Sequence, residues 1–370
     1  LGFLLQRFHD VTPTVWFAAN SEIFAGLAEL GMFFLMLLAG IRMEPLEFAR
    51  ASKSAALIAV GGMLLPIGAG FVLGQVVLPE SAFKLAQSLF LGVALAVTAV
   101  PVAVRVFMDL GALESRVGRA VVAAALWDDL LSLFMLAILL AVIAGNGGGV
   151  FVLADLLPVV GNVVLFFAIT IPIGIWLFPL LARYFRNLSF PEVEFSMMLI
   201  AALAYAVLAE SLHLHHIIGA FMAGMFFHPK VVEREVYDRV EQQMSGLTRG
   251  FLAPIFFVSV GIHLDFSSVV DVPGFVVVLT LLALVSKLVG SGVPAWLVGF
   301  PKREALAVGV GMSGRGAVEL VVAGVALEAG LFLHPDPPGP IVHALFSAIV
   351  IMAIVTTVAM PIALHLLWKK

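Results

Sequence analysis

Apolar residues occur along this chain in long runs, separated by short stretches that carry most of the charge. Many of the runs last the roughly 20 residues that an α-helix needs to cross about 30 Å of hydrocarbon. A membrane β-barrel would instead show short segments of alternating hydrophobicity. The pattern therefore predicts an all-α polytopic membrane protein with about 11 transmembrane helices. The predicted spans are near Glu22–Ile41, Ser54–Leu78, Phe83–Phe107, Val117–Ala144, Pro158–Tyr184, Glu192–Ser211, His215–Phe227, Phe251–Ile262, Pro273–Val298, Ala305–Phe332 and Ile341–Trp368.

Basic residues gather in every second connection between these spans. The intervening connections hold Lys84 alone among Lys and Arg. Because cytoplasmic connections are enriched in Lys and Arg, the alternation predicts a cytoplasmic C-terminus and places Leu1 outside. The polar stretch Lys230–Arg249 is expected to lie at the membrane surface. The chain opens without Met in a turn-like segment, so we expect its natural N-terminus to lie upstream.

Composition agrees with a lipid environment, since 62% of the residues are hydrophobic and 12% are charged. The chain has no basic block of the kind that binds nucleic acid. It has no cysteine, which excludes disulfides and thiolate metal sites. No cofactor motif is present.

Two of the spans contain helix-breaking residues. Pro101 interrupts the third span, where it disfavours helix at Val100. Three glycines and an arginine interrupt the tenth span at Gly311–Gly316. Each break lies in the middle helix of a three-helix group, Ser54–Ala144 or Pro273–Trp368, and the two groups start from opposite sides of the membrane. Such paired breaks indicate a transporter with inverted repeats and two crossed broken helices.

Ionisable residues in the middle of spans are the candidate functional groups, because a charge at that depth costs about 2.5–3.5 kcal/mol on insertion scales. Asp128 and Asp129 lie mid-span, and adjacent helical residues project about 100° apart, so they face different surroundings. Lys287 is too central to reach the interface and needs an acidic partner, for which Asp128 or Asp129 is the candidate.

For other polar residues the sequence supports a direct role in ion binding less strongly. Arg315 and Glu319 are four residues apart and are expected to pair in a structural or gating role. Glu29 and Glu210 are candidate cavity-lining groups. The histidines His213, His215 and His216 have metal-like spacing, but an outer loop at a helix start explains them better, and pH sensing remains open to them.

A buried carboxylate can hold a proton or a small cation, but hardly both, and this competition can drive exchange. A hard cation such as Na⁺ prefers oxygen ligands, which Thr98, the unwound backbone near it, one aspartate and Ser132 can supply. In the absence of the cation, Lys287 can neutralise one aspartate. This hypothesis predicts that Lys287→Ala alters coupling or voltage dependence more than it alters folding.

At these positions the chain resembles the cation/proton antiporter-2 family, and within it the NapA-type sodium/proton antiporters. The resemblance covers nearly the whole chain in family order. The residues that carry it are Thr98–Val106, Gly118–Asp129, Gly219–Gly224, Pro254–Phe257 with Gly261, Lys287, and Gly311–Glu319.

The resemblance implies Asp129 as the main carrier of Na⁺ or H⁺, with no other metal, and Asp128 as the partner of Lys287. It implies electrogenic exchange by an elevator-like movement in a homodimer of the bacterial inner membrane. NapA-type members have thirteen helices, so the resemblance leads us to expect that the first two are absent from this chain. A core domain is implied at 54–146 and 271–370, a dimerisation domain at 1–53 and 191–270 with an interfacial segment at 230–250, and a linker helix at 147–190.

Potassium/proton exchange on the same scaffold is the nearest alternative, since Met312–Glu319 resembles plant and bacterial potassium- or sodium-exchanging relatives more than it resembles NapA. An intramembrane aspartyl protease needs facing carboxylates from two helices, which adjacent Asp128 and Asp129 do not supply alone. A channel is disfavoured by a lysine opposing the acidic site. We therefore expect a secondary transporter, not an enzyme.

Overall fold

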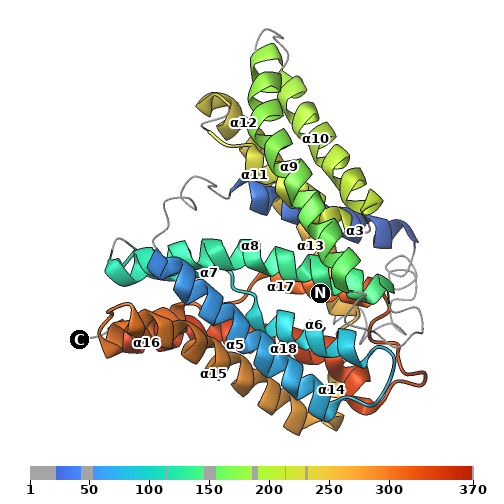
Figure 1. Ribbon diagram of the computed structural model, residues 1–370, viewed down its shortest axis with the longest axis vertical. Helices are drawn as coiled ribbons and strands as arrows, with labels where there is room; N and C mark the ends of the chain where they lie inside the picture. The colour runs from blue at the N-terminus through green and yellow to red at the C-terminus, as the bar shows by residue number, and fades with distance from the viewer. Residues whose placement is uncertain are drawn as a thin grey trace. The chain divides into compact units, whose positions relative to one another are not determined.

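The computed structural model describes residues 22–42, 53–113, 115–145, 156–185, 191–212, 214–229 and 232–368. Within these ranges all regular secondary structure is helical, which confirms the predicted all-α fold class. The chain forms two compact units, each assembled from segments that are far apart in sequence (Figure 1). The predictions that concern Leu1, His213, Lys369 and Lys370 lie outside the described residues.

The first unit, Leu1–Pro45 with Val152–Leu264, is held together by close helix crossings. A Cβ atom on Gly40 would lie 2.2 Å from the Phe221 carbonyl oxygen, and one on Gly224 would lie 2.3 Å from the Leu37 carbonyl oxygen. Small residues of this kind let helix backbones approach closely in membranes. The helices of this unit are α3 (Glu22–Ile41), α9 (Leu156–Phe185), α10 (Pro191–Ser211), α11 (His216–Phe226), α12 (Arg234–Leu247), the π-turn η2 (Thr248–Leu252) and α13 (Ala253–Ile262).

The polar segment after α11 is helical and runs without interruption into the next apolar helix. The π-turn joins α12 to α13 just before Pro254, which has no N–H and would crowd a regular turn. The Ala253 N–H donates instead to the Thr248 carbonyl oxygen, which keeps the helix continuous. Sequence alone had suggested a surface segment followed by a separate short helix.

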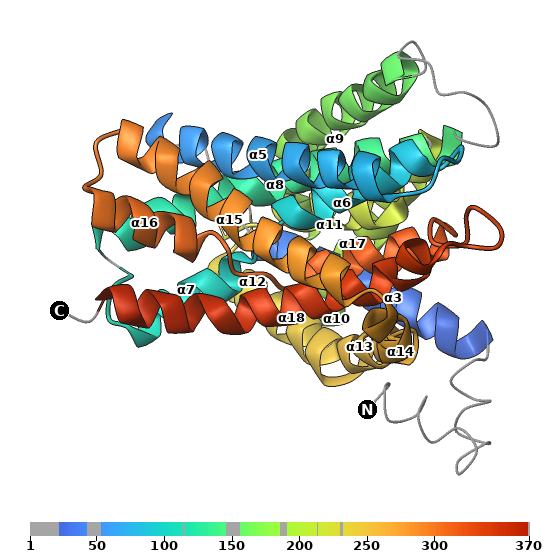
Figure 2. The same cartoon turned by 90° about the horizontal axis from the view of Figure 1, so that it is seen from below.

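Figure 2 shows the helices of the second unit, Leu46–Phe151 with Asp265–Lys370. They pack around fully buried residues such as Phe107, Val121, Val308 and Leu364. Its middle helices α6 and α16 each end at an interruption and are followed by α7 and α17. The helices of this unit are α5 (Lys53–Val77), α6 (Lys84–Ala96), α7 (Val100–Asp109), α8 (Arg116–Gly145), α14 (Phe266–Asp271), α15 (Pro273–Leu297), α16 (Lys302–Gly311), α17 (Ala317–Glu328) and α18 (Pro340–Trp368).

Helices α5 and α15 cross at two facing glycines, one from each three-helix group. A Cβ atom on Gly61 would lie 2.4 Å from the Gly290 carbonyl oxygen, and one on Gly290 would lie 2.6 Å from the Gly61 carbonyl oxygen. No real Cβ atom approaches backbone so closely, so any side chain here would force the two helices apart. This crossing therefore holds α5 of the first three-helix group close to α15 of the second.

The Gly61→Ala substitution is expected to destabilise the protein by about 1–3 kcal/mol, because it overpacks this crossing. Gly68→Ala on the same helix is the matched control, since a Cβ atom there meets nothing within 4 Å. Alanine favours a helix over glycine by about 0.5–1 kcal/mol, so the control is expected to be neutral or slightly stabilising. Thermal unfolding of both purified variants in detergent measures the difference. Equal melting temperatures for the two would contradict the tight crossing.

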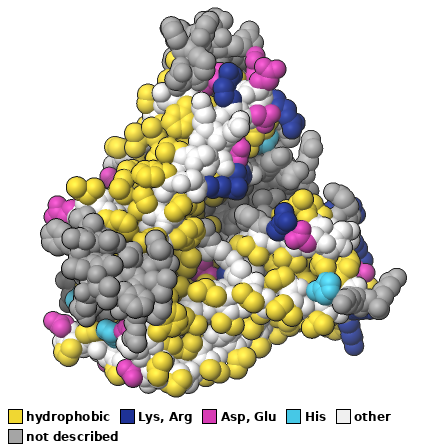
Figure 3. Space-filling view, turned by 180° about the vertical axis from the view of Figure 1, so that it is seen from behind, with side chains coloured by type: hydrophobic (Ala, Val, Ile, Leu, Met, Phe, Trp, Pro, Cys, Tyr) yellow, Lys and Arg dark blue, Asp and Glu magenta, His cyan; other side chains and the backbone are white. Residues whose placement is uncertain are grey.

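Six helices of the described residues are long and apolar enough to cross a membrane, and α6, α11 and part of α9 are shorter apolar helices. Large apolar side chains such as Val76, Trp176 and Leu366 are exposed, and apolar side chains cover much of the face seen in Figure 3. A water-soluble protein rarely exposes so much contiguous apolar surface. This apolar surface is what the sequence predicts for a multi-pass membrane protein.

Candidate ion-binding site

The two interruptions of the second unit lie where the sequence contains its helix-breaking residues. Helix α6 ends at Ala96, and α7 begins at Val100 after an extended Ala99 (φ −103°, ψ 102°). Pro101 lies in the first turn of α7, where its missing N–H has no helical partner to lose. The expectation that Pro101 disfavours helix at Val100 was wrong, since Val100 is the first residue of α7 and a proline is tolerated in a first turn. Helix α16 ends at Gly311, and α17 begins after Gly316.

The interrupted segments contact each other directly. The Ala99 N–H donates to the Gly314 carbonyl oxygen at 2.9 Å, and the buried Thr98 hydroxyl donates to the Met312 carbonyl oxygen at 3.0 Å. A Cβ atom on Gly316 would lie 2.7 Å from the Cβ of Ala99, so only glycine fits there. A backbone N–H left without a helical partner at one interruption thus binds a backbone carbonyl of the other interruption.

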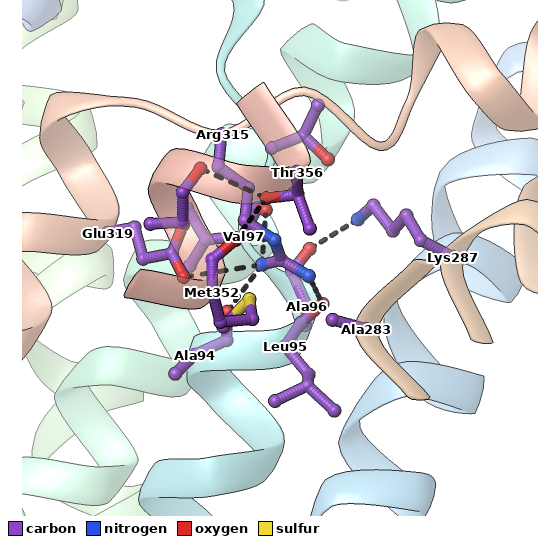
Figure 4. Close-up of polar contacts among 12 residues, drawn as sticks. Ala94, Leu95, Ala96, Val97, Ala283, Lys287, Arg315, Glu319, Met352 and Thr356 are labelled. Atoms are coloured by element: carbon purple, nitrogen blue, oxygen red, sulfur yellow. Dashed lines mark hydrogen bonds and ion pairs between the residues drawn. The ribbon is translucent and has the colours of Figure 1, made fainter. Parts of the chain in front are cut away.

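Lys287 of α15 binds Asp128 of α8 beside this crossing. Its Nζ lies 3.0 Å from each Asp128 carboxylate oxygen, and both side chains are fully buried. The same Nζ donates to the carbonyl oxygen of Ala96, the last residue of α6 (Figure 4). A buried lysine and a buried aspartate can both stay charged here because each offsets the other.

Arg315 lies in the interruption before α17. Its guanidinium binds backbone carbonyls at the end of α6. Its Nη1 donates to the carbonyl oxygens of Ala94 at 2.6 Å and Val97 at 3.3 Å, and its Nη2 donates to that of Leu95 at 2.7 Å (Figure 4). The Thr357 hydroxyl donates to the Arg315 carbonyl oxygen at 3.0 Å.

The expected proximity of Arg315 and Glu319 is present, with Nη1 3.6 Å from Oε1. The contact of Arg315 with α6 was not anticipated from sequence. A signal for it existed, since a helix that stops mid-membrane leaves its last four carbonyls without helical partners and carries negative charge at that end. Lys287 and Arg315 together bind the carbonyls of Ala94 through Val97 and place two positive charges there.

Residues 4–370 of the chain match the family model described as "Sodium/hydrogen exchanger, transmembrane". The chain belongs to the sodium/hydrogen exchanger family.

Individual relatives of this exchanger extend over most of its length. It is 32% identical to the Na⁺/H⁺-K⁺ antiporter GerN of Bacillus cereus, over 92% of this chain and 82% of GerN. It is 28% identical to the high-affinity Na⁺/H⁺ antiporter NhaS3 of Synechocystis, over 97% of this chain and 75% of NhaS3. Its fold is similar to that of the sodium proton antiporter MjNhaP1 from Methanocaldococcus jannaschii. The TM-score is 0.70 at 16% identity, covering 99% of this chain and 89% of MjNhaP1.

The remaining predicted site residues of the exchanger are placed as follows. Ser132 lies one turn after Asp128 on α8 and is buried, and its hydroxyl has no hydrogen-bond partner among the described residues. Thr98 adjoins Asp128 as well as Met312. Asp129 and Pro101 lie on α8 and α7, and their side chains are outside the described part of the chain. The transport roles of these residues stay predictions.

The candidate residues of the first unit gather around His216. Its ring nitrogens lie 3.6 Å from a Glu29 carboxylate oxygen and 3.5 Å from one of Glu210. His215 lies at the N-cap of α11, and its ring centroid is 4.2 Å from that of His216, with the two rings tilted by 36°. Among the described residues no group of three or more His, Asp or Glu has an arrangement that could hold a metal ion. The role of these histidines stays a prediction.

Proposed function

We propose that this exchanger moves Na⁺ in one direction and H⁺ in the other, with Asp129 as the carboxylate that the two ions share. The chain is a secondary transporter and not an enzyme. One observation carries the proposal: a buried Lys287–Asp128 ion pair next to two interrupted helices that bind each other. Asp129 directly follows Asp128, so it shares the same depth on α8.

The chemistry follows from competition for one carboxylate. Low polarity favours the protonated form, so proton release needs a compensating positive charge. An incoming Na⁺ supplies that charge, and oxygen ligands replace its water. Thr98, between α6 and α7, and Ser132, one turn after Asp128 on α8, both have buried hydroxyl oxygens. Proton binding then displaces the cation, which completes an exchange cycle without any covalent step.

Lys287 adds a second charged group to the cycle. It is bound to Asp128 and to the Ala96 carbonyl, at the end of α6 where Na⁺ would arrive. A cation close to this lysine would weaken its pairing and favour loss of its proton. In this proposal Lys287 makes the exchange electrogenic.

The arrangement by units supports a transport mechanism in which one body moves. The second unit contains all the residues proposed to bind ions, and we propose it as the core transport domain. The first unit, with α3 and α10 to α13, is the proposed dimerisation domain of a homodimer, and α9 is the proposed linker helix. Elevator-like movement of the core, a cell-membrane location in bacteria, contact with membrane lipid and a cytoplasmic C-terminus complete the proposal.

Potassium/proton exchange is the second candidate, because the relative GerN is named for K⁺ as well as Na⁺. Proteoliposomes loaded with a pH dye distinguish the two. Na⁺ is expected to dissipate an imposed pH gradient at lower concentration than Li⁺ or K⁺. Dissipation by K⁺ at the lowest concentration would reverse the assignment of the cation. Absence of any cation-dependent proton flux would refute exchange altogether.

A further inference from the structure

Glu319 is a buried acid that the proposed cycle does not use. It lies in the first turn of α17 and is fully buried. Neither of its carboxylate oxygens has a hydrogen-bond partner among the described residues. An ionised carboxylate in such surroundings is very unfavourable unless it is closely paired, whereas a neutral carboxyl group is tolerated.

Few charges are available to keep Glu319 ionised. Arg315 is the nearest, and Lys287 of α15 acts from farther away. Helix α6 has Lys84 as its one charged residue, at its far start, and the titratable residues of α18, His343 and His365, lie toward its two ends. At the middle of α18 the Thr356 hydroxyl donates to the Met352 carbonyl instead (Figure 4).

The two buried acid–base pairs of this unit differ in geometry. Lys287 lies at hydrogen-bond distance, 3.0 Å, from both oxygens of Asp128. The Arg315 Nη1 lies 3.6 Å from Glu319 but only 2.6 Å from the Ala94 carbonyl oxygen. Charged partners usually approach to about 2.7–2.9 Å, and a guanidinium prefers an ionised carboxylate to a neutral carbonyl. Arg315 makes the opposite choice, as expected if Glu319 carries a proton.

We propose that Glu319 is a second proton-binding site of this exchanger, whose protonation state decides how tightly Arg315 binds the end of α6. With the proton on Glu319, both Nη groups of Arg315 bind the carbonyls of Ala94 and Leu95. When the proton leaves to water, the carboxylate competes with Ala94 for Nη1. The end of α6 then loses part of its contact with the positively charged guanidinium, close to the Ala96 carbonyl that Lys287 binds. The inference rests on the proposed function, because it assigns to Glu319 control of the same ion site.

The pH dependence of exchange in proteoliposomes tests this site. E319Q cannot lose a proton, so Arg315 stays on α6 at every pH. We expect activity in E319Q to persist at higher pH, with the alkaline midpoint raised by about one unit or more. E328Q is the matched control, because Glu328 is at the exposed end of the same helix. We expect its profile to superimpose on that of the native protein. An E319Q profile that also superimposes, or one that shifts toward acid, would overturn the proposal.

A second measurement needs no variant. Infrared spectra of the full native chain, grown with and without ¹³C-glutamate, reveal protonated glutamic acid by its isotope-sensitive carbonyl stretch. Glu319 is the only fully buried glutamate among the described residues. We expect such a band at neutral pH and its loss at alkaline pH; absence of the band at neutral pH would exclude a protonated Glu319. If native vesicles showed no Na⁺-dependent proton flux, the proposed function would fail, and the infrared result would still decide the proton site.

Discussion

Asp129→Asn is expected to abolish Na⁺-dependent proton flux in proteoliposomes, down to the level of vesicles without protein. Asparagine keeps the size of aspartate but neither binds a proton in this pH range nor offers a negative charge to Na⁺. Both halves of the exchange cycle therefore stop together. Dequenching of an internal pH dye on addition of Na⁺ measures the loss.

Asp109→Asn is the matched control for this prediction. Asp109 is exposed at the end of α7, and its oxygen pairs with the Arg105 Nε at 3.1 Å. Exposed pairs of this kind contribute only about 0–1 kcal/mol, so this variant is expected to fold and to transport normally. Native flux in Asp129→Asn would remove Asp129 from the mechanism, whatever the behaviour of the control.

Lys287→Met is expected to lower the stability of the protein by about 3–5 kcal/mol, because it leaves a buried Asp128 without its partner. The sequence alone had suggested a stronger effect on coupling than on folding. Full burial and contact with both carboxylate oxygens make a large folding effect necessary as well. The double variant Lys287→Met/Asp128→Asn removes both charges and is expected to recover most of the lost stability. Thermal unfolding in detergent measures all three proteins.

The recovered double variant then isolates the transport role of the lysine. Its exchange is expected to lose the voltage dependence of the native protein, measured as flux under imposed membrane potentials. Lys302→Met, at the exposed start of α16, is the control for loss of a positive charge. A double variant as unstable as the single one would show that the two charges do not offset each other. Unchanged voltage dependence would exclude Lys287 from charge coupling.

The sequence was sufficient to predict the helical fold class and the places where helices break, because the physics there is local. Pro101 lacks a backbone donor and cannot continue a helix from the residues before it, so a new helix begins close to it. The glycines from Gly311 onward weaken a helix whatever surrounds them. Runs of apolar residues are equally informative, since lipid leaves few alternatives to a helix. Family membership also followed, because Asp128–Asp129, Lys287 and the Gly311–Glu319 stretch occur in the order found in the family.

The electrostatics of the crossing were harder to predict, because they depend on distant contacts. The spacing of four residues suggested that Arg315 would pair mainly with Glu319. Its guanidinium is instead closest to the carbonyl oxygens of Ala94 and Leu95. Backbone carbonyls have no signature in a sequence, so a helix end that needs positive charge is found only when its position is known. The same holds for the second contact of Lys287, with the Ala96 carbonyl.

The bond between Arg315 and Ala94 joins positions 221 residues apart, which constrains how the protein is made. During synthesis α6 enters the bilayer long before its cap has been translated. Until then its terminal carbonyls need another hydrogen-bond donor, such as water. The proposed ion site is consequently among the last parts of this exchanger to form, and a chain released before Arg315 is translated would lack the positive group that binds the polar end of α6.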